Sequence, residues 1–174
     1  LKGGVMSVGD GFRDDMGYYR RVGIRKWILD GGVRPRLAPL RSLGLREMHP
    51  HVTWNYFTDQ GGEMVSKKLH NGYSFFLNSG AYVEFSANPV FERIDKPFAI
   101  DPRATLQPGG YGWNEWTIRG ATDLSRPLSL SYTLTAGGFW SGDQKTVNAT
   151  LTVKPDYHFR ASLGVQRTQA SLDE

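Results

Sequence analysis

Histidines and carboxylates are the residues of this sequence that could support metal or acid–base chemistry. His49 and His51 stand two positions apart, so they lie on the same side of an extended segment and could share a metal ion, although the spacing suggests no third ligand. The alternative is that both are solvated at a strand end. Glu84 and Glu92 fall on one face of one expected strand, too far apart for the acid–base pair of a glycosidase. We therefore expect no metal site and no catalytic residues.

The motifs of common enzyme classes are also absent from the sequence. There is no Gly-x-Ser-x-Gly elbow, no P-loop and no dinucleotide fingerprint, and residues 109–112 (GGYG) lack the spacing that the last of these requires. Without cysteine the chain has no disulfide, no thiolate ligand and no cysteine nucleophile. The sequence thus predicts a protein that is not an enzyme and has no cofactor.

Four aromatic residues are candidates for ligand binding, namely Tyr111, Trp113, Trp116 and Trp140. A flat ring face matches the face of a sugar ring, so exposed aromatic side chains of this kind could stack on a carbohydrate. The alternative is that they belong to a core or to an aromatic belt at a membrane interface.

The composition limits the class of protein that positions these residues. A chain of 174 residues is expected to form one domain, residues 1–174. No run approaches the roughly 18–20 apolar residues of a spanning helix, which excludes a helical membrane bundle. The 21 basic and 17 acidic residues are interleaved, so nucleic acid is not an expected partner. The first residues lack the features of a signal peptide, from which we expect a processed or truncated chain.

Two-residue alternation of apolar and polar side chains dominates from about residue 46 onwards. Between residues 157 and 165, for example, Tyr157, Phe159 and Leu163 alternate with polar neighbours, as in an extended strand with one apolar face. Residues 1–16 are expected to be irregular, residues 29–45 to form a link and residues 93–112 a long loop. The pattern predicts an all-β, antiparallel up-and-down meander of about eight long strands, at residues 17–28, 46–58, 63–77, 81–92, 113–123, 128–140, 145–154 and 157–170.

Alternation is equally compatible with a soluble β-sandwich and with a membrane barrel, whose apolar faces point to lipid. Three features favour the barrel. Charged residues occupy expected mid-strand positions on the polar faces, at Glu84, Arg119 and Arg160. The strands are about ten residues or longer, the length a tilted spanning strand needs. Aromatic residues lie near strand ends, as in an interfacial belt: Tyr18, Tyr19, Trp54, Tyr56, Trp113, Trp116, Trp140 and Tyr157.

Four stretches carry a resemblance to a bacterial family: residues 88–100 (NPVFERIDKPFAI), 106–111 (LQPGGY), 55–59 (NYFTD) and 137–143 (GGFWSGD). They resemble the outer-membrane barrel domain of unknown function that follows a family-nine carbohydrate-binding module. The likeness spans about residues 11–172, and its motifs are structural rather than catalytic. It implies a transmembrane β-barrel in the bacterial outer membrane, with the lipid bilayer, a carbohydrate and a larger membrane complex as partners. Members are much longer, so this chain looks like a fragment or short version.

The expected function is therefore non-enzymatic, in surface glycan handling or the passage of a solute. Connections 78–80, 124–127 and 155–156 are expected on the periplasmic side together with both termini, and connections 59–62, 93–112 and 141–144 on the outside. Glu84, Arg119, Arg160 and Gln166 are expected to face inward. The alternative is a soluble β-sandwich that acts as a binding or accessory subunit on a larger complex.

Overall fold

The computed structural model describes residues 1–13, 21–102 and 104–172. Tyr18 and Tyr19, and the first residues of the strand expected at 17–28, lie outside the described residues. Among those described, no helix has the length and the apolar composition needed to cross a bilayer. The chain is instead an all-β antiparallel meander, with one short helix of four residues.

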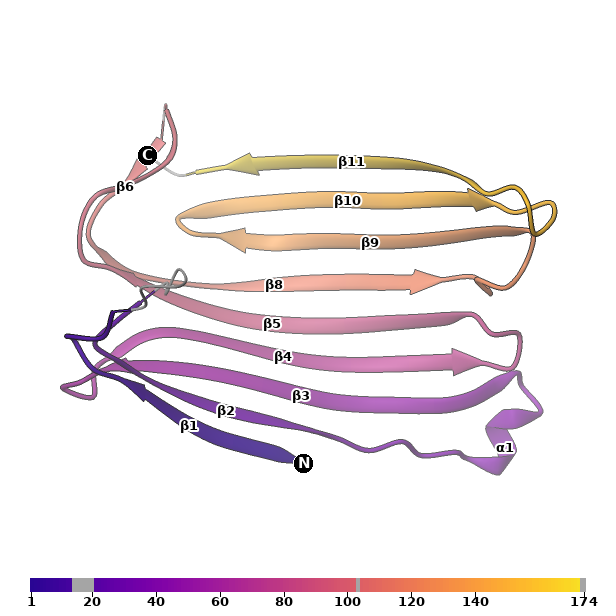
Figure 1. Cartoon of the computed structure of the whole chain (residues 1–174), viewed down its shortest axis with the longest axis horizontal. Helices are drawn as coiled ribbons and strands as arrows, with labels where there is room; N and C mark the ends of the chain where they lie inside the picture. Colours follow the sequence, from indigo (N-terminus) through magenta and orange to yellow (C-terminus); the bar gives the residue numbers. More distant parts are fainter. Residues whose placement is uncertain (14–20, 103, 173–174) are drawn as a thin grey trace.

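Nine strands form one sheet in the order β1-β2-β3-β4-β5-β8-β9-β10-β11, with every neighbouring pair antiparallel (Figure 1). Strands β3 to β5 and β8 to β11 are each 11 to 15 residues long, which confirms the expectation of long strands. A separate two-stranded sheet, β6–β7, lies within the long loop. The elements are β1 (Lys2–Val8), β2 (Ile24–Gly32), α1 (Ala38–Arg41), β3 (Leu45–Asp59), β4 (Met64–Leu77), β5 (Tyr82–Ile94), β6 (Phe98–Asp101), β7 (Ala104–Leu106), β8 (Gly109–Ala121), β9 (Leu128–Phe139), β10 (Gly142–Val153) and β11 (Ala161–Ser171).

The sheet is open in the part of the chain that the structure describes. Strands β1 and β11 are its two edges and pair with β2 and β10 alone, so no barrel is closed. Figure 1 shows them at opposite margins of the sheet. The confirmed part of the predicted fold is thus the all-β antiparallel meander.

Several expectations about the strands are wrong. Residues 29–32, expected in the link, belong to β2, and residues 109–112, expected in the long loop, begin β8. Residues 2–8, expected to be irregular, form β1, because pairing with β2 overrides a stretch in which Gly3 and Gly4 break any alternation. The last strand begins at Ala161 rather than at residue 157, because Asp156 Oδ1 accepts hydrogen bonds from the backbone N–H groups of residues 158 and 159 and holds a turn. Arg160 therefore precedes β11 and is not a mid-strand charge.

The connections alternate between the two ends of the sheet, as expected from a meander. Those of residues 60–63, 95–108 and 140–141 gather at one end, and those of residues 33–44, 78–81, 122–127 and 154–160 at the other (Figure 1). The expectation that the termini share one end is wrong, because nine strands are an odd number: β1 and β11 start from the same end and run in the same direction.

The two faces of the sheet differ in composition and in exposure. The polar face contains most of the buried polar side chains, and Glu84 is only 3% exposed. Gln166 pairs with Asn148 on this face. The apolar face is the exposed one, and its large apolar side chains are more than a third exposed along β8 to β11. The buried polar-face residues are Glu47, Ser66, Ser74, Glu84, Ser86, Asn88, Ser129 and Thr152.

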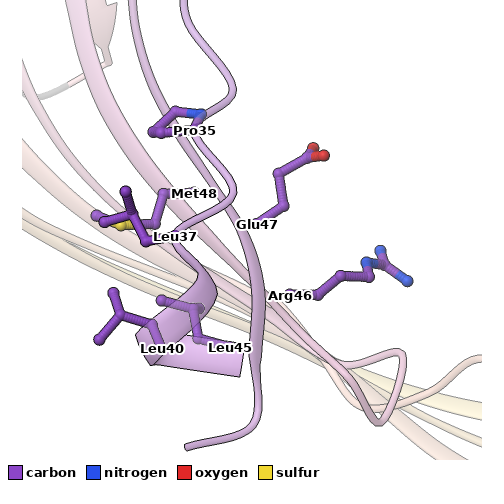
Figure 2. Close-up of a pocket in the computed structure, with 7 residues that line it drawn as sticks. All are labelled: Pro35, Leu37, Leu40, Leu45, Arg46, Glu47 and Met48. Atoms are coloured by element: carbon purple, nitrogen blue, oxygen red, sulfur yellow. The ribbon is translucent and has the colours of Figure 1, made fainter. Parts of the chain in front are cut away.

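The link between β2 and β3 is held to the sheet by one buried carboxylate. Glu47 on β3 accepts hydrogen bonds from Arg34 at 3.1 Å and from Arg36 at 2.8 Å. Beyond them α1 places Leu37, Leu40, Leu45 and Met48 together, while Arg46 and Glu47 point away from this apolar cluster (Figure 2). The link therefore covers one corner of the apolar face.

Candidate functional site

The most highly buried charge of the described residues, Glu84, lies at the centre of the polar face. It sits on β5, and the register places Ser74 of β4 on one side of it and Arg119 of β8 on the other. The Ser74 hydroxyl donates to Oε2 at 2.6 Å, and Arg119 Nη2 donates to the same oxygen at 2.9 Å. Arg119 Nε lies 2.8 Å from the second oxygen, Oε1. A buried carboxylate needs such a cation, because an unpaired one is strongly disfavoured.

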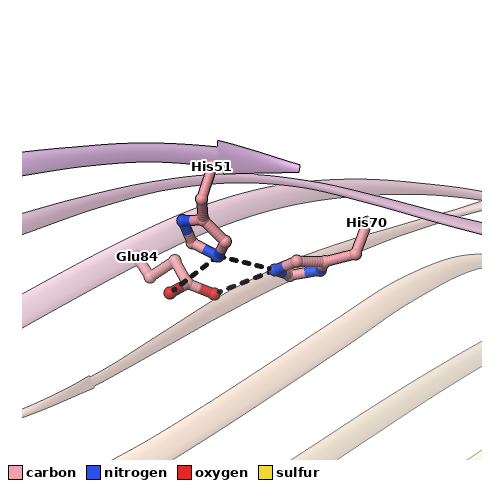
Figure 3. Close-up of side chains that lie close together, drawn as sticks. All are labelled: His51, His70 and Glu84. Carbon is pink, nitrogen blue, oxygen red and sulfur yellow. Dashed lines mark hydrogen bonds and ion pairs between the residues drawn. The ribbon is translucent and has the colours of Figure 1, made fainter. Parts of the chain in front are cut away.

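Two histidine rings face the open side of this carboxylate (Figure 3). His51 comes from β3 and His70 from β4, and their Nε2 atoms are 3.1 Å apart. The Nε2 atom of His51 is 3.9 Å from Glu84 Oε2, and that of His70 is 3.6 Å from Oε1. Glu84 Oε1 is buried, and no donor of the described residues is oriented to form a hydrogen bond with it, although Arg119 Nε lies near it. We call His51, His70 and Glu84 the His–His–Glu cluster.

Both rings are oriented by hydrogen bonds at their other nitrogen. His51 Nδ1 lies 2.9 Å from the carbonyl oxygen of His49, and His70 Nδ1 lies 2.7 Å from Oδ1 of Asn88. Oxygen acceptors of this kind require Nδ1–H as donor, so in a neutral ring Nε2 holds a lone pair. The two Nε2 lone pairs and the Glu84 carboxylate consequently converge on one point.

Glycines leave the space that the rings occupy. Gly72 lies opposite His51 in the register, and a Cβ built on it would collide with the His51 ring and come within 2.8 Å of His70 Nε2. A Cβ on Gly32 would lie 2.8 Å from both His49 Nε2 and His51 Cβ. His49 stacks on His51, with ring centroids 4.5 Å apart. The close approach of the rings therefore depends on glycine at these two positions.

Three of the four aromatic residues predicted to bind a ligand come together. Trp140 packs against Tyr111, with ring centroids 5.6 Å apart, and against Trp113 at 5.1 Å. Phe98 of β6 adds a ring 6.4 Å from Trp140. Trp140 lies in the β9–β10 turn and has a positive φ of 56°. This aromatic cluster lies at the end of the sheet that carries the long loop.

Trp116 is not part of that cluster. It lies on the apolar face of β8, opposite Ala87 and Ala136, and is 62% exposed. Its ring belongs to a shallow apolar hollow that Tyr73, Phe85 and Ile118 also line.

The His–His–Glu cluster is the part of the site that the sequence analysis did not assemble. The considered pair was His49 and His51, which do stack, but His49 is not among the residues whose ligand atoms converge. His51 lies on β3, His70 on β4 and Glu84 on β5. The register of these strands, and not spacing along the chain, brings the three side chains together. Glu84 was expected on the polar face of its strand, and it is buried on that face.

Comparison of the chain with models of protein families, with curated proteins and with solved structures finds no match. The fold therefore defines the class, an all-β antiparallel sheet with buried polar side chains on one face.

Proposed function

We propose that this chain forms the wall of an outer-membrane β-barrel, or much of it, with the polar face towards the lumen and the apolar face towards lipid. One observation carries the proposal: most of the buried side chains are polar, whereas the large leucine and valine side chains of β9 to β11 are exposed. A water-soluble sheet has the reverse distribution, because burying apolar surface drives its folding. A membrane barrel has this distribution because lipid surrounds it.

The apolar face is extensive and, among the described residues, no second sheet covers it. Exposed fractions reach 60% for Leu128 and 75% for Leu163. Soluble monomers rarely leave contiguous apolar surface of this extent in water. Lipid is the medium that best accounts for it.

The boundary of the apolar face adds an independent argument. On five of the eight strands from β2 to β11, we compare the polar residue of this face that borders the apolar side chains on their long-loop side. This residue lies further along the strand as the sheet is crossed from β2 to β11. Register places each of these residues two positions further from that end than the one before it. The residues are Arg25 on β2, Lys67 on β4, Asn114 on β8, Lys145 on β10 and Arg167 on β11.

This displacement supports a particular strand tilt. The boundary moves by eight residues across seven neighbouring strand pairs, from β2 to β11. With about 3.3 Å per residue and about 4.8 Å between strands, a level boundary then requires a tilt of about 38°. Strands of membrane barrels tilt by about 35–45°. The polar boundary is thus arranged as the edge of a lipid band around a barrel would be.

Aromatic side chains lie just inside this boundary. Trp27 on β2 and Trp116 on β8 are each two residues from the boundary residue of their strand. Indole rings favour the membrane interface. Asn71 is a polar residue within the band, and its amide donates to the carbonyl oxygen of Ala87. We assign Trp116 to an interfacial belt and not to ligand binding.

The function proposed for the barrel is non-enzymatic, in the handling of surface glycans or the passage of a solute at the bacterial outer membrane. The aromatic cluster of Tyr111, Trp113 and Trp140 lies at the long-loop end, which we assign to the outside because the long loops of membrane barrels are extracellular. Rings there would stack on a sugar. The resemblance of the sequence motifs to the outer-membrane barrel domain supports the same assignment.

A protein partner is the second candidate, in which the chain is an accessory subunit whose apolar face docks on a larger complex. The outer edge of β11 favours it, because none of the described strands pairs there and such an edge offers its backbone groups to another chain. The difference between the two candidates is the medium that touches the apolar face.

Extraction and gel migration test the proposal. We expect the chain to need detergent for solubility and, when folded in detergent, to migrate differently before and after boiling. A chain that is monodisperse in buffer without detergent would contradict the barrel. As a control, strand content is measured by circular dichroism to show that the compared samples are folded.

A further inference from the structure

We propose that the His–His–Glu cluster binds a divalent transition-metal cation of the Zn²⁺ type, with Nε2 of His51, Nε2 of His70 and a carboxylate oxygen of Glu84 as ligands. These three groups are the set of described residues whose ligand atoms lie within 4.8 Å of one another. Imidazole nitrogen and carboxylate oxygen are the usual non-thiolate ligands of Zn²⁺. The proposal does not depend on the membrane assignment, because all three residues belong to one sheet.

The arrangement of lone pairs calls for a positive charge between the rings. With Nδ1 of each ring donating, to the His49 carbonyl oxygen and to Asn88, the Nε2 atoms of two neutral rings would present lone pairs to each other across 3.1 Å. Glu84 adds a negative charge on the same side. Such a contact is repulsive unless a metal ion or a proton lies between the groups.

The separations of the ligand atoms fit a tetrahedral site. Bonds of about 2.0–2.1 Å to zinc place tetrahedral ligands about 3.3 Å apart. The separations are 3.1 Å between the two nitrogens, 3.6 Å from His70 Nε2 to Glu84 Oε1 and 3.9 Å from His51 Nε2 to the other oxygen, Oε2; one ligand atom from each residue lies within 4.8 Å of the other two. Movement of the carboxylate towards the rings closes the site. Three protein ligands leave a fourth position for water.

The surroundings hold the ligands in this geometry without a metal. Asn88 and the His49 carbonyl oxygen fix the two rings, as partners of ligating histidines commonly do. Ser74 and Arg119 fix the carboxylate, and the charge of Arg119 offsets part of the attraction that Glu84 offers a cation. Because two of the three ligand atoms are imidazole nitrogens, we expect the site to bind Zn²⁺, Co²⁺ or Ni²⁺ in preference to Mg²⁺ or Ca²⁺, which favour oxygen ligands.

Metal titration of the folded full-length chain tests the proposal. We expect Zn²⁺ to bind with a stoichiometry of one, by calorimetry, and Co²⁺ to give the intense visible absorption of a tetrahedral site that Zn²⁺ then removes. His70→Ala leaves the Glu84–Arg119 pair intact and should weaken binding by at least 100-fold. Asn88→Ala, which removes a partner of a ligand, should weaken it about 10–100-fold.

The control is His158→Ala, which removes an exposed histidine in the β10–β11 turn and should leave the affinity unchanged. Strand content by circular dichroism verifies that each variant is folded. Absence of Zn²⁺ binding by the folded wild-type chain would overturn the proposal and leave a shared proton as the occupant. Equal binding by wild type and His70→Ala would overturn it too, because the metal would then be held elsewhere.

Discussion

Small residues determine which side chains meet on the polar face. Gly72 is directly opposite His51, and its missing side chain is the space into which the His51 ring extends. The rings of His51 and His70 can therefore come within hydrogen-bonding distance of each other. At this position glycine has a steric role, because neither its φ nor a turn requires it.

Gly72→Ala should destabilise the fold by about 1–3 kcal/mol, as insertion of a methyl group into a packed site usually does. The His51 ring has to move, which also breaks its contact with His70. Urea unfolding in detergent measures the change in the free energy of unfolding. The matched control is Gly112→Ala on β8, where the nearest atom to a new Cβ is 3.8 Å away; an equal loss in both variants would contradict the steric explanation.

Asp123 stabilises the β8–β9 turn in its charged form. It accepts hydrogen bonds from the Ser125 hydroxyl at 2.6 Å, from the Ser125 backbone N–H at 2.9 Å and from Arg126 at 3.2 Å. These groups, the Ser125 hydroxyl foremost, hold the pKa of Asp123 below its ordinary value. A lowered pKa means that the contribution to stability is complete above the pKa of the unfolded chain, about 3.9, and is lost as the pH falls through the folded value.

Asp123→Asn should thus lower the free energy of unfolding at neutral pH, and its effect should shrink as the pH falls through the lowered pKa of Asp123, because the wild-type carboxylate then becomes protonated. Urea unfolding at a series of pH values measures the difference between the two proteins. A difference that stays constant down to the acid end would show that the charge of Asp123 is not responsible.

The sequence predicted the positions of the strands better than any other feature of the structure. Alternation predicted β3, β5, β9 and β10 to within three residues at each end, because much of each strand has a two-residue period, and β4 was predicted as closely from the turn signals on either side of it. It missed β1, whose glycines carry no pattern, and it placed the start of β11 too early, because the turn at Asp156 depends on a side-chain hydrogen bond. Local pattern specifies a strand, whereas partners elsewhere in the chain specify its ends.

The candidate site was harder to predict for the same reason. The separation of His51 from His70 along the chain is 19 residues, and Glu84 is on a third strand. Only the register between β3, β4 and β5 shows that the three side chains meet. The aromatic cluster was predicted more fully, because Tyr111 and Trp113 share one strand and one face, but Trp116 was grouped with them despite its opposite parity.

Strand β10 allows the two faces to be compared with adjacent residues. Leu151 lies on the apolar face between Leu130 and Leu163, and Thr150 lies on the polar face between Ser131 and Gly164. For a barrel in lipid we expect Leu151→Arg to cost up to about 2–4 kcal/mol, depending on its depth in the bilayer, and Thr150→Arg to cost much less. Unfolding in lipid vesicles measures both. If Leu151→Arg proves neutral while the chain gains solubility in buffer, its side chain faces water.

The whole molecule is described by its two unlike faces. The polar face contains most of the buried polar side chains and the Glu84–Arg119 pair, whereas the apolar face is exposed along β8 to β11 and bounded by polar residues along an inclined line. Neither face alone distinguishes lipid from a protein partner. The inclination of the boundary does favour lipid. A level membrane edge that crosses tilted strands would produce this inclined line, and the strand tilt is the only quantity needed to explain it.

The most direct test is a scan of spin-label accessibility along β9, which is straightforward because the chain has no cysteine to remove. Single cysteines at residues 128–136 are labelled and the protein is reconstituted in lipid vesicles. We predict that labels at Leu128, Leu130, Tyr132 and Leu134 collide with oxygen and not with a water-soluble nickel chelate, and that labels at Ser129, Ser131, Thr133 and Thr135 show no such preference for oxygen. Leucine positions open to the nickel chelate, or closed to both reagents as in a dry protein interface, would contradict the account.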